Sequence, residues 1–258
     1  MKKISTILLF LILALFLWAG NGLAYEFGTN ITIFDNRFDS TSSNSWYGKQ
    51  EDQEVEPGMI YNQSWDLEGF FLDDYILTMV GGFNFGIANL GYEAGDIFID
   101  IDGDAQYGSG ADDTVLNYGY EYVLDLNFLL KTYDVYALND TSSFLYVLDY
   151  NAPESNPWRY DPVNSPADAP VSSGSIVYHS PLSDDQVGFL GGTHYAARVN
   201  LSFLGGDINN FIAHSTMECG NDNLMGKVPE PSTMLFLGFG LVGLAAVGRK
   251  KFQQGNIE

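Results

Sequence analysis

The sequence has a single cysteine and few basic residues. Cys219 is the only thiol among 258 residues, so no disulfide bond can form within the chain. Eleven Lys and Arg residues stand against 33 Asp and Glu residues, which gives a formal net charge of −22. A surface this acidic repels nucleic acids and anionic lipid headgroups. Because no disulfide can form, packing must stabilise the fold. Because the surface is acidic, we expect cations, especially Ca²⁺, and neutral polysaccharide as partners.

The motifs that mark common enzyme classes are also missing. The chain has no Gly-x-Ser-x-Gly elbow, no His-Glu-x-x-His helix, no phosphate-binding loop with its lysine and no dinucleotide fingerprint. Glycoside hydrolysis needs only two carboxylates, but this chain offers too many pairs for the sequence to rank them. We expect a non-enzymatic protein. A secreted carbohydrate-active hydrolase and a carbohydrate-binding module are the alternatives.

The first 24 residues have the pattern of a secretory signal peptide. Lys2 and Lys3 precede an uninterrupted apolar run at 7–18, and small residues follow it. We predict cleavage between Ala24 and Tyr25, and an uncleaved N-terminal anchor is the alternative. The mature chain is then exported from the cytoplasm.

Residues 25–227 are predicted to form one all-β extracellular domain. Short apolar and aromatic stretches alternate with Gly, Asn and Asp, and no stretch has the period of a long amphipathic helix. These features fit an antiparallel β-sandwich, jelly-roll or immunoglobulin-like, better than a barrel. The expected strands are 31–34, 75–80, 83–85, 97–101, 120–128, 133–138, 144–148 and 195–204, with long loops at 39–57 and 151–173.

An acidic turn after the expected strand 97–101 is the strongest candidate site. Carboxylates at alternate positions leave a strand end on one side, where a hard cation such as Ca²⁺ can gather several of them. The pattern departs from an EF-hand, because alanines replace its turn glycine and its final glutamate. A solvated acidic turn is the alternative to a structural calcium site. The candidate ligands are Asp100, Asp102, Asp104, Asp112 and Asp113, with Asp96 just before them.

A transition-metal site is a weaker hypothesis. Imidazole and thiolate groups suit such metals, and His194, His214 and Cys219, with His179 as a fourth donor, are the available residues. Their spacing matches no zinc template. We expect isolated histidines and a buried thiol instead.

Aromatic residues in predicted loops are candidates for carbohydrate binding. An aromatic ring stacks on the apolar face of a pyranose while neighbouring polar groups bond its hydroxyls. Core packing is the alternative role for each ring. The candidates are Trp46, Trp65 and Trp158, together with Tyr47 and Tyr160.

The C-terminal segment 228–251 has three parts. An extended Pro-Glu-Pro stretch comes first, an apolar run at 234–248 follows, and a basic cluster ends it. About 15 residues make only about 22 Å of helix, short of the roughly 30 Å hydrocarbon core, so the run suits a transient membrane anchor. A permanent tail anchor is the alternative. Residues 252–258 are expected to form a cytoplasmic overhang. The basic cluster is Arg249, Lys250 and Lys251.

This tail resembles the PEP-CTERM sorting signal. The resemblance rests on Val-Pro-Glu-Pro-Ser-Thr at 228–233, the Gly-rich apolar run and the basic end. It implies processing by an exosortase, an integral membrane cysteine transpeptidase of bacteria that have an outer membrane and make extracellular polysaccharide. Pro229, Glu230 and Pro231 are then the recognition element, and the catalytic groups belong to the exosortase.

The resemblance extends to location and partners. Segments 95–108, 117–123 and 214–226 are similar to those of other PEP-CTERM proteins, which implies a shared domain without an assigned activity. The implied partners are the secretion machinery, the exosortase and extracellular polysaccharide. We expect export across the inner membrane to the cell envelope, outer surface or extracellular matrix, and a structural or adhesive role there.

Overall fold

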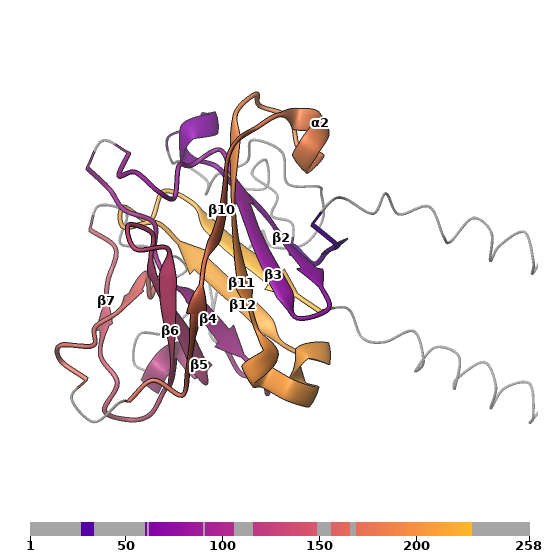
Figure 1. Cartoon of the computed structure of the whole chain (residues 1–258). Coiled ribbons are helices and arrows are strands. Elements are labelled where there is room, and N and C mark those ends of the chain that lie inside the picture. The colour runs from indigo at the N-terminus through magenta and orange to yellow at the C-terminus, as the bar shows by residue number, and fades with distance from the viewer. Residues whose placement is uncertain are drawn as a thin grey trace, which may run out of the picture.

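A computed structural model describes residues 27–33, 60, 62–89, 91–105, 116–148, 156–165 and 169–228 (Figure 1). The predicted signal peptide, the loop carrying Trp46, and the tail from Pro229 onward lie outside these residues and stay predictions. Within the described part of the chain, no helix is both long and apolar enough to cross a membrane.

Two antiparallel sheets make up the fold, which confirms the predicted all-β class. The first sheet contains, in spatial order, β1 (Thr29–Asn30), β2 (Leu67–Asp73), β3 (Ile76–Gly81), β11 (His194–Asn200) and β10 (Val177–Leu182). The second contains β13 (Asn223–Lys227), β12 (Ile212–Thr216), β4 (Ile97–Asp100), β5 (Tyr122–Asn127), β6 (Thr132–Ala137) and β9 (Ser172–Ser175). A separate ribbon pairs β7 (Phe144–Leu145) with β8 (Arg159–Tyr160).

Helices in the described residues are short. They are the 3₁₀ turns η1 (Gln63–Trp65), η3 (Leu116–Gly119) and η5 (Ser202–Asn209), and the single-turn α2 (Asp184–Val187). α2 begins with a capping box, because Ser183 and Gln186 exchange side-chain and backbone hydrogen bonds, and it ends at the left-handed Gly188.

The main core lies between the two sheets. Alternate strand residues point inward, as β-pleating requires, and Leu77 of β3, Ile99 of β4 and Leu124 of β5 are fully buried there. Burying such a side chain stabilises the fold by about 1.5–3 kcal/mol. A core of this size is consistent with a fold that has no disulfide.

The chain passes from one sheet to the other at both edges of the structure. At one edge β9 and β10 are separated only by Ile176, whose amide donates to the Lys131 carbonyl at 2.8 Å. At the other edge, the Ile31 amide donates to Phe70 of the first sheet at 2.9 Å, and its carbonyl accepts from Lys227 of the second at 2.7 Å. These crossings satisfy backbone groups that would otherwise lie open at sheet edges.

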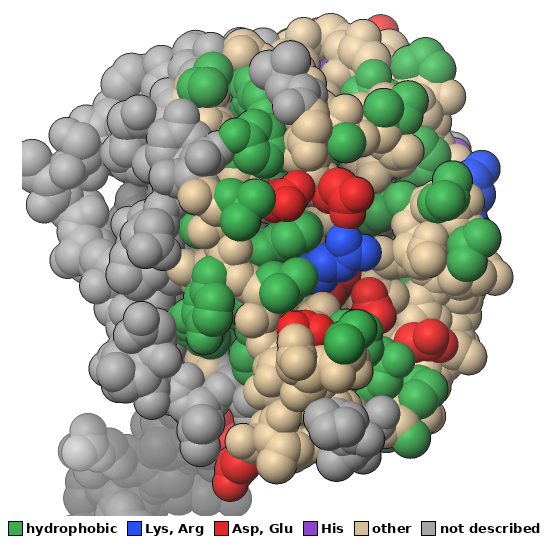
Figure 2. Space-filling view, turned by 90° about the vertical axis from the view of Figure 1, so that its left-hand side faces the viewer, with side chains coloured by type: hydrophobic (Ala, Val, Ile, Leu, Met, Phe, Trp, Pro, Cys, Tyr) green, Lys and Arg blue, Asp and Glu red, His purple; other side chains and the backbone are tan. Residues whose placement is uncertain are grey.

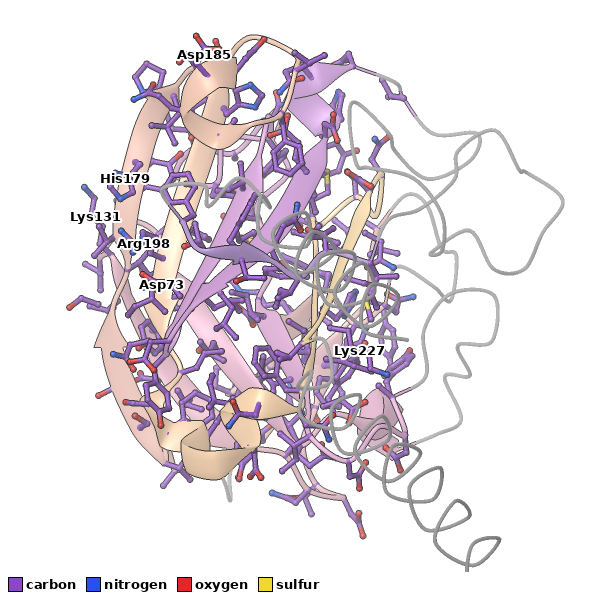
Figure 3. The ribbon with its side chains drawn as sticks, turned by 90° about the vertical axis from the view of Figure 1, so that its right-hand side faces the viewer. Asp73, Lys131, His179, Asp185, Arg198 and Lys227 are labelled. Carbon is purple, nitrogen blue, oxygen red and sulfur yellow. The ribbon has the colours of Figure 1, made fainter. Side chains whose placement is uncertain are left out.

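The first sheet is also covered on its outer face. The Phe27 ring lies 6.2 Å from Phe71 and 6.1 Å from His179, and the Arg198 guanidinium lies 5.9 Å from its centre. Figure 3 labels His179 and Arg198 on this side of the molecule. Phe189 packs edge-on against Phe71 at 5.7 Å. Burial on both faces explains why β2 contains the consecutive apolar residues Phe70, Phe71 and Leu72.

Several predicted boundaries differ from the structure. In the strand expected at 31–34, the described residues hold only an isolated bridge at Thr32, and the strand expected at 144–148 is limited to β7. The loop expected at 151–173 contains β8 and the start of β9.

Two further predicted strands adopt another backbone conformation. Residues 83–85 form a turn rather than a strand, although Phe83 and Phe85 are both buried in the core. Residues 195–204 leave the ladder after Asn200 and continue as η5. In both cases the aromatic composition indicated burial correctly, but burial does not determine backbone conformation.

Candidate functional site

The acidic turn is organised by Asp100, the last residue of β4. Its side chain is buried, and its Oδ1 accepts hydrogen bonds from the amides of Asp102 at 3.0 Å and Gly103 at 2.7 Å. Its Oδ2 accepts from the Ala105 amide at 3.1 Å. Gly103 has a φ of +88°, which a residue with a side chain adopts only with strain. The Asp100 carboxylate therefore shapes the loop that carries Asp102 and Asp104.

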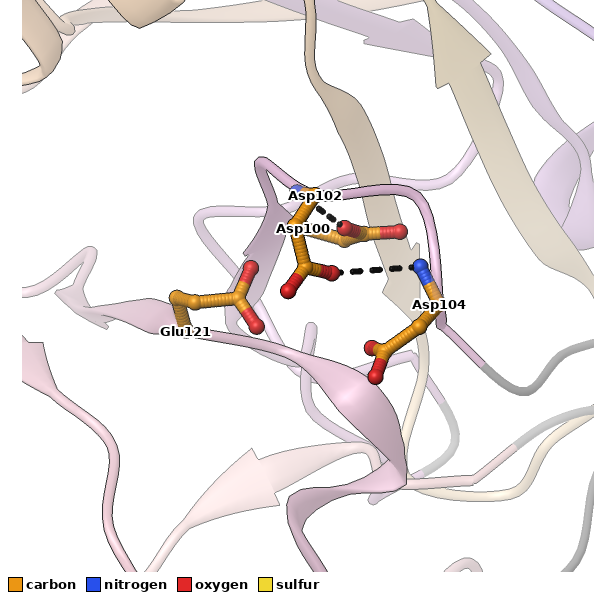
Figure 4. A group of neighbouring side chains, drawn as sticks. All are labelled: Asp100, Asp102, Asp104 and Glu121. Carbon is orange, nitrogen blue, oxygen red and sulfur yellow. Dashed lines mark hydrogen bonds between the residues drawn. The ribbon is translucent and has the colours of Figure 1, made fainter.

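Glu121 completes a group of four carboxylates. Its amide donates to the Ile99 carbonyl at 3.0 Å, and its Oε2 accepts from the Ile101 amide at 2.7 Å, so the antiparallel partner strand brings it beside the turn. One oxygen from each of Asp100, Asp102, Asp104 and Glu121 lies within 4.8 Å of the others (Figure 4). Glu121 was absent from the predicted ligand set, because only the pairing of β4 with β5 reveals it.

The geometry of this acidic cluster suits a hard cation. Ca²⁺ binds oxygens at about 2.3–2.6 Å, so two ligands of one ion are separated by at most about 5 Å. The 4.8 Å limit satisfies that requirement. Four carboxylate oxygens leave room for further ligands among the six to eight that Ca²⁺ commonly takes. Asp112 and Asp113 lie outside the described residues.

The carboxylates of the cluster repel one another. Burial raises the pKa of Glu121 to about 7; the Ile101 amide opposes this shift, and the charges of Asp100, Asp102 and Asp104 add to it. Partial burial also raises the pKa of Asp104, and repulsion from Asp102 and Asp100 adds to that effect. A bound divalent cation would remove this repulsion and lower both values.

Asp96 does not join the cluster, although it is close in sequence. It lies before β4, at the other end of that strand, where its Oδ1 accepts from the Leu126 amide and its Oδ2 from the Tyr160 amide, both at 2.8 Å. Burial raises its pKa to about 8, and Asp125 adds to the shift while Arg159 opposes it. Asp96 therefore connects β5 to β8.

The structure does not assemble the transition-metal candidates. His214 stacks on Tyr120 with ring centroids 5.6 Å apart, and Cys219 is buried in the main core. His194 lies in the other sheet, between two carboxylates, and His179 packs against Phe27. Among the described residues, the acidic cluster is the only group of His, Cys, Asp and Glu side chains that could hold a metal ion.

The carbohydrate candidates that the structure describes are buried. Trp65 and Trp158 are each 4% exposed, and Tyr160 is 1% exposed. Stacking on a sugar requires an accessible ring face, so these three rings serve packing in this structure instead. Core packing, the alternative role, thus accounts for these three rings. Trp46 and Tyr47 lie outside the described residues.

His194 forms a buried ionic clamp that the sequence did not predict. Its Nδ1 lies 2.7 Å from Glu68 Oε2, and its Nε2 lies 2.9 Å from Asp184 Oδ1. Glu68 and the imidazole are both fully buried. Asp184 also accepts from the Gly192 amide at 2.8 Å, so the clamp holds α2 and the loop after it against β11 and β2.

The charge of the clamp depends on pH. Burial alone would lower the pKa of His194, but hydrogen bonds and charges from Glu68 and Asp184 raise it overall. Because the pKa is higher in the folded protein, the clamp contributes its full stability at low pH. That contribution is lost as pH rises through the folded-state pKa.

We expect His194→Gln to destabilise the protein by about 3–5 kcal/mol at pH 6, because it leaves the buried Glu68 without a cationic partner. Urea unfolding measures this loss. Asp184→Asn, which removes the partly exposed partner, is the matched control and should cost less. Equal stability of wild type and His194→Gln at pH 6 would contradict the clamp.

Calcium should stabilise the fold if the acidic cluster binds it. At a hundredfold excess over Kd, binding contributes about 2.7 kcal/mol, which raises Tm by roughly 5–10 °C for a domain of this size. We expect this rise in millimolar CaCl₂ relative to EDTA, with a much smaller effect of MgCl₂. Asp102→Ala combined with Asp104→Ala should abolish it. An equal response to both metals would identify the cluster as a solvated turn.

Glu121→Gln should change how stability depends on pH. The raised pKa of about 7 means that, in EDTA, wild type loses stability as pH rises from about 5 to above 7. Glu121→Gln removes this loss and should make the protein more stable at pH 8 by about 1–2 kcal/mol, after allowance for solvent screening. Asp140→Asn, an exposed substitution with the same charge change, is the control. Parallel stability curves for the two variants would refute the repulsion.

Comparisons with known proteins identify the tail. The family model of the PEP-CTERM protein-sorting motif matches residues 227–251. No curated protein and no solved structure matches the chain. The matched segment contains the predicted recognition residues Pro229, Glu230 and Pro231 and the basic cluster that ends at Lys251. Residues 227–251 therefore carry a PEP-CTERM protein-sorting motif, as the sequence predicted.

Proposed function

We propose that this protein is a non-enzymatic structural or adhesive component of the cell envelope or the extracellular polysaccharide matrix. The PEP-CTERM motif carries the proposal, because it implies a secreted, surface-sorted protein processed by an exosortase. The folded β domain that precedes the motif is then the part that works outside the cell. A signal peptide at 1–24 would start the export, and a short apolar run at 234–248 would hold the chain in the membrane until processing.

The position of the motif supports this role. Val228 is the last described residue, and its amide donates to the Phe211 carbonyl at 3.1 Å. Pro229 follows directly in the sequence, so the recognition element begins one residue beyond the last hydrogen bond described for the domain. The folded part is thus held close to the membrane surface before the tail is cut.

The surface chemistry also supports an extracellular structural role. Acidic residues outnumber basic ones three to one, which keeps the protein soluble and disfavours nucleic acids and anionic lipids as partners. We propose that Ca²⁺, abundant outside cells, binds the acidic cluster and stiffens the turn after β4. A carbohydrate-active hydrolase stays the alternative hypothesis from the enzyme class.

Replacing Pro229, Glu230 and Pro231 together with alanine tests the sorting step in cells. We expect the variant to accumulate in the inner membrane with its tail intact, because the exosortase lacks its recognition element. Membrane fractionation and the mass of the C-terminal peptide measure this. The control is the wild-type chain in cells that lack the exosortase, which should show the same accumulation. A variant that reaches the surface as wild type does would contradict the assignment.

The same strains test the proposed role. If the protein works in the matrix, cells with the alanine variant should lose cohesion although they make as much protein as wild type. Unchanged cohesion, or hydrolysis of matrix polysaccharide by the purified chain, would overturn a non-enzymatic matrix function.

A further inference from the structure

A cavity of about 230 Å³ lies beside β8, the partner strand of β7, which is on the left in Figure 1. Its walls come from the loop after β3, the turn between β5 and β6, and Arg159 of β8. Figure 2 shows this face, where basic, acidic and hydrophobic side chains gather close together. We call this cavity the Arg159 pocket. The residues used below are Ile87, Ala88, Glu93, Phe128, Leu129 and Arg159.

The charge around the Arg159 pocket is negative overall. Arg159 Nη1 donates to Glu93 Oε2 at 2.8 Å, and the Glu93 side chain is 58% exposed. Asp96 and Asp125 also lie close enough to Arg159 to interact with its charge. Asp134 stands directly opposite Asp125 in the β5–β6 ladder, a pairing of like charges that normally destabilises a sheet.

One guanidinium therefore interacts with three carboxyl groups, and a fourth, that of Asp134, lies opposite Asp125. Burial raises the pKa of Asp125; Arg159 opposes the shift and Asp134 adds to it. An anionic ligand, such as a phosphate or a uronic acid, would add to this repulsion. A ligand with a positive charge would relieve it.

The rim of the pocket is apolar and open to solvent. Ile87 is 68% exposed and Leu129 is 90% exposed. Phe128 is half-buried and stacks on Phe85, with ring centroids 5.9 Å apart and planes inclined by 19°. Exposed aliphatic groups beside an aromatic ring form a surface that a ligand's apolar face can cover.

We propose that the Arg159 pocket binds one ring of a cationic amino-sugar oligosaccharide. A pyranose ring has an apolar face for Phe128 and Leu129 and hydroxyls for Arg159, and its ammonium group complements Glu93 and Asp125. The cavity is smaller than the roughly 300–1,000 Å³ of sites for drug-sized ligands, so it suits a single ring of a longer chain. A lysine side chain offers the same charge but is too thin to fill the space.

This inference rests on the proposed matrix role for the source of its ligand. Calorimetry on the purified full chain in a neutral detergent tests it, because this measurement does not depend on whether cells sort the protein. A failure of binding is thus distinguishable from a failure of localisation. The probes are a glucosamine tetramer, its N-acetylated form and cellotetraose, which differ only in the group on carbon 2.

We expect the glucosamine tetramer to bind at least tenfold more tightly than the other two oligosaccharides, and its affinity to fall as salt is added. Equal binding of all three would overturn recognition of the amine. Equal binding of tetralysine would overturn the assignment to an amino sugar. No binding of the glucosamine tetramer would overturn the proposal altogether.

Matched variants separate the pocket from the general acidity of the chain. Ala88→Trp fills the cavity without a change of charge and should lower the affinity at least tenfold, whereas Ala169→Trp at an exposed position should not. Glu93→Gln should also weaken binding, while Asp207→Asn, with the same charge change on the exposed η5 segment, should leave it unchanged. If each pair of variants binds alike, the interaction is non-specific attraction and the proposal fails.

Discussion

The two sheets depend on backbone hydrogen bonds at residues where the chain changes sheets. Ile31 bonds to both sheets, and Ile176 separates two strands that belong to different sheets. These crossings tie the sheet edges together in a chain whose single cysteine forms no internal disulfide. They also occupy edge backbone groups that would otherwise be open to strands of other chains.

Three different arrangements accommodate the excess of carboxylates. Asp96 is buried and accepts two backbone amides, and Glu68 is buried against His194. The acidic cluster at the end of β4 is left with unbalanced repulsion, which is why its stability should respond to a cation. The acidic residues are therefore not confined to the surface, because individual buried carboxylates bond to the strands and loops that they hold together.

Much of the fold could be predicted from local pattern. The alternation in 75–80, 97–101, 120–128 and 133–138 matches β3, β4, β5 and β6 closely, because these segments bury one face against a common core. The order of the strands could not be predicted, since it depends on contacts between distant segments. The turns at 83–85 and after Asn200 were missed because aromatic content reports burial and not backbone conformation.

The candidate site was predicted in part for the same reason. Alternating aspartates after β4 are visible in the sequence, but Glu121 joins them only through the pairing of β4 with β5. The Glu68–His194–Asp184 clamp and the Arg159 pocket bring together residues that are far apart in the chain. The sorting motif at 227–251 was predictable, because such a signal is read as a linear segment.

The two ends of the described domain leave from one side. Ile31 and Lys227 are hydrogen-bonded neighbours, and in Figure 1 the indigo N-terminal strand lies on the right while β7 lies on the left. A tail held in the membrane would thus turn the β7 side outward. β13, from whose end the tail continues, is hydrogen-bonded to β12 on one side and to residues 31–33 on the other. A pull on the tail would therefore have to break the hydrogen bonds on both sides of β13 before the domain comes apart.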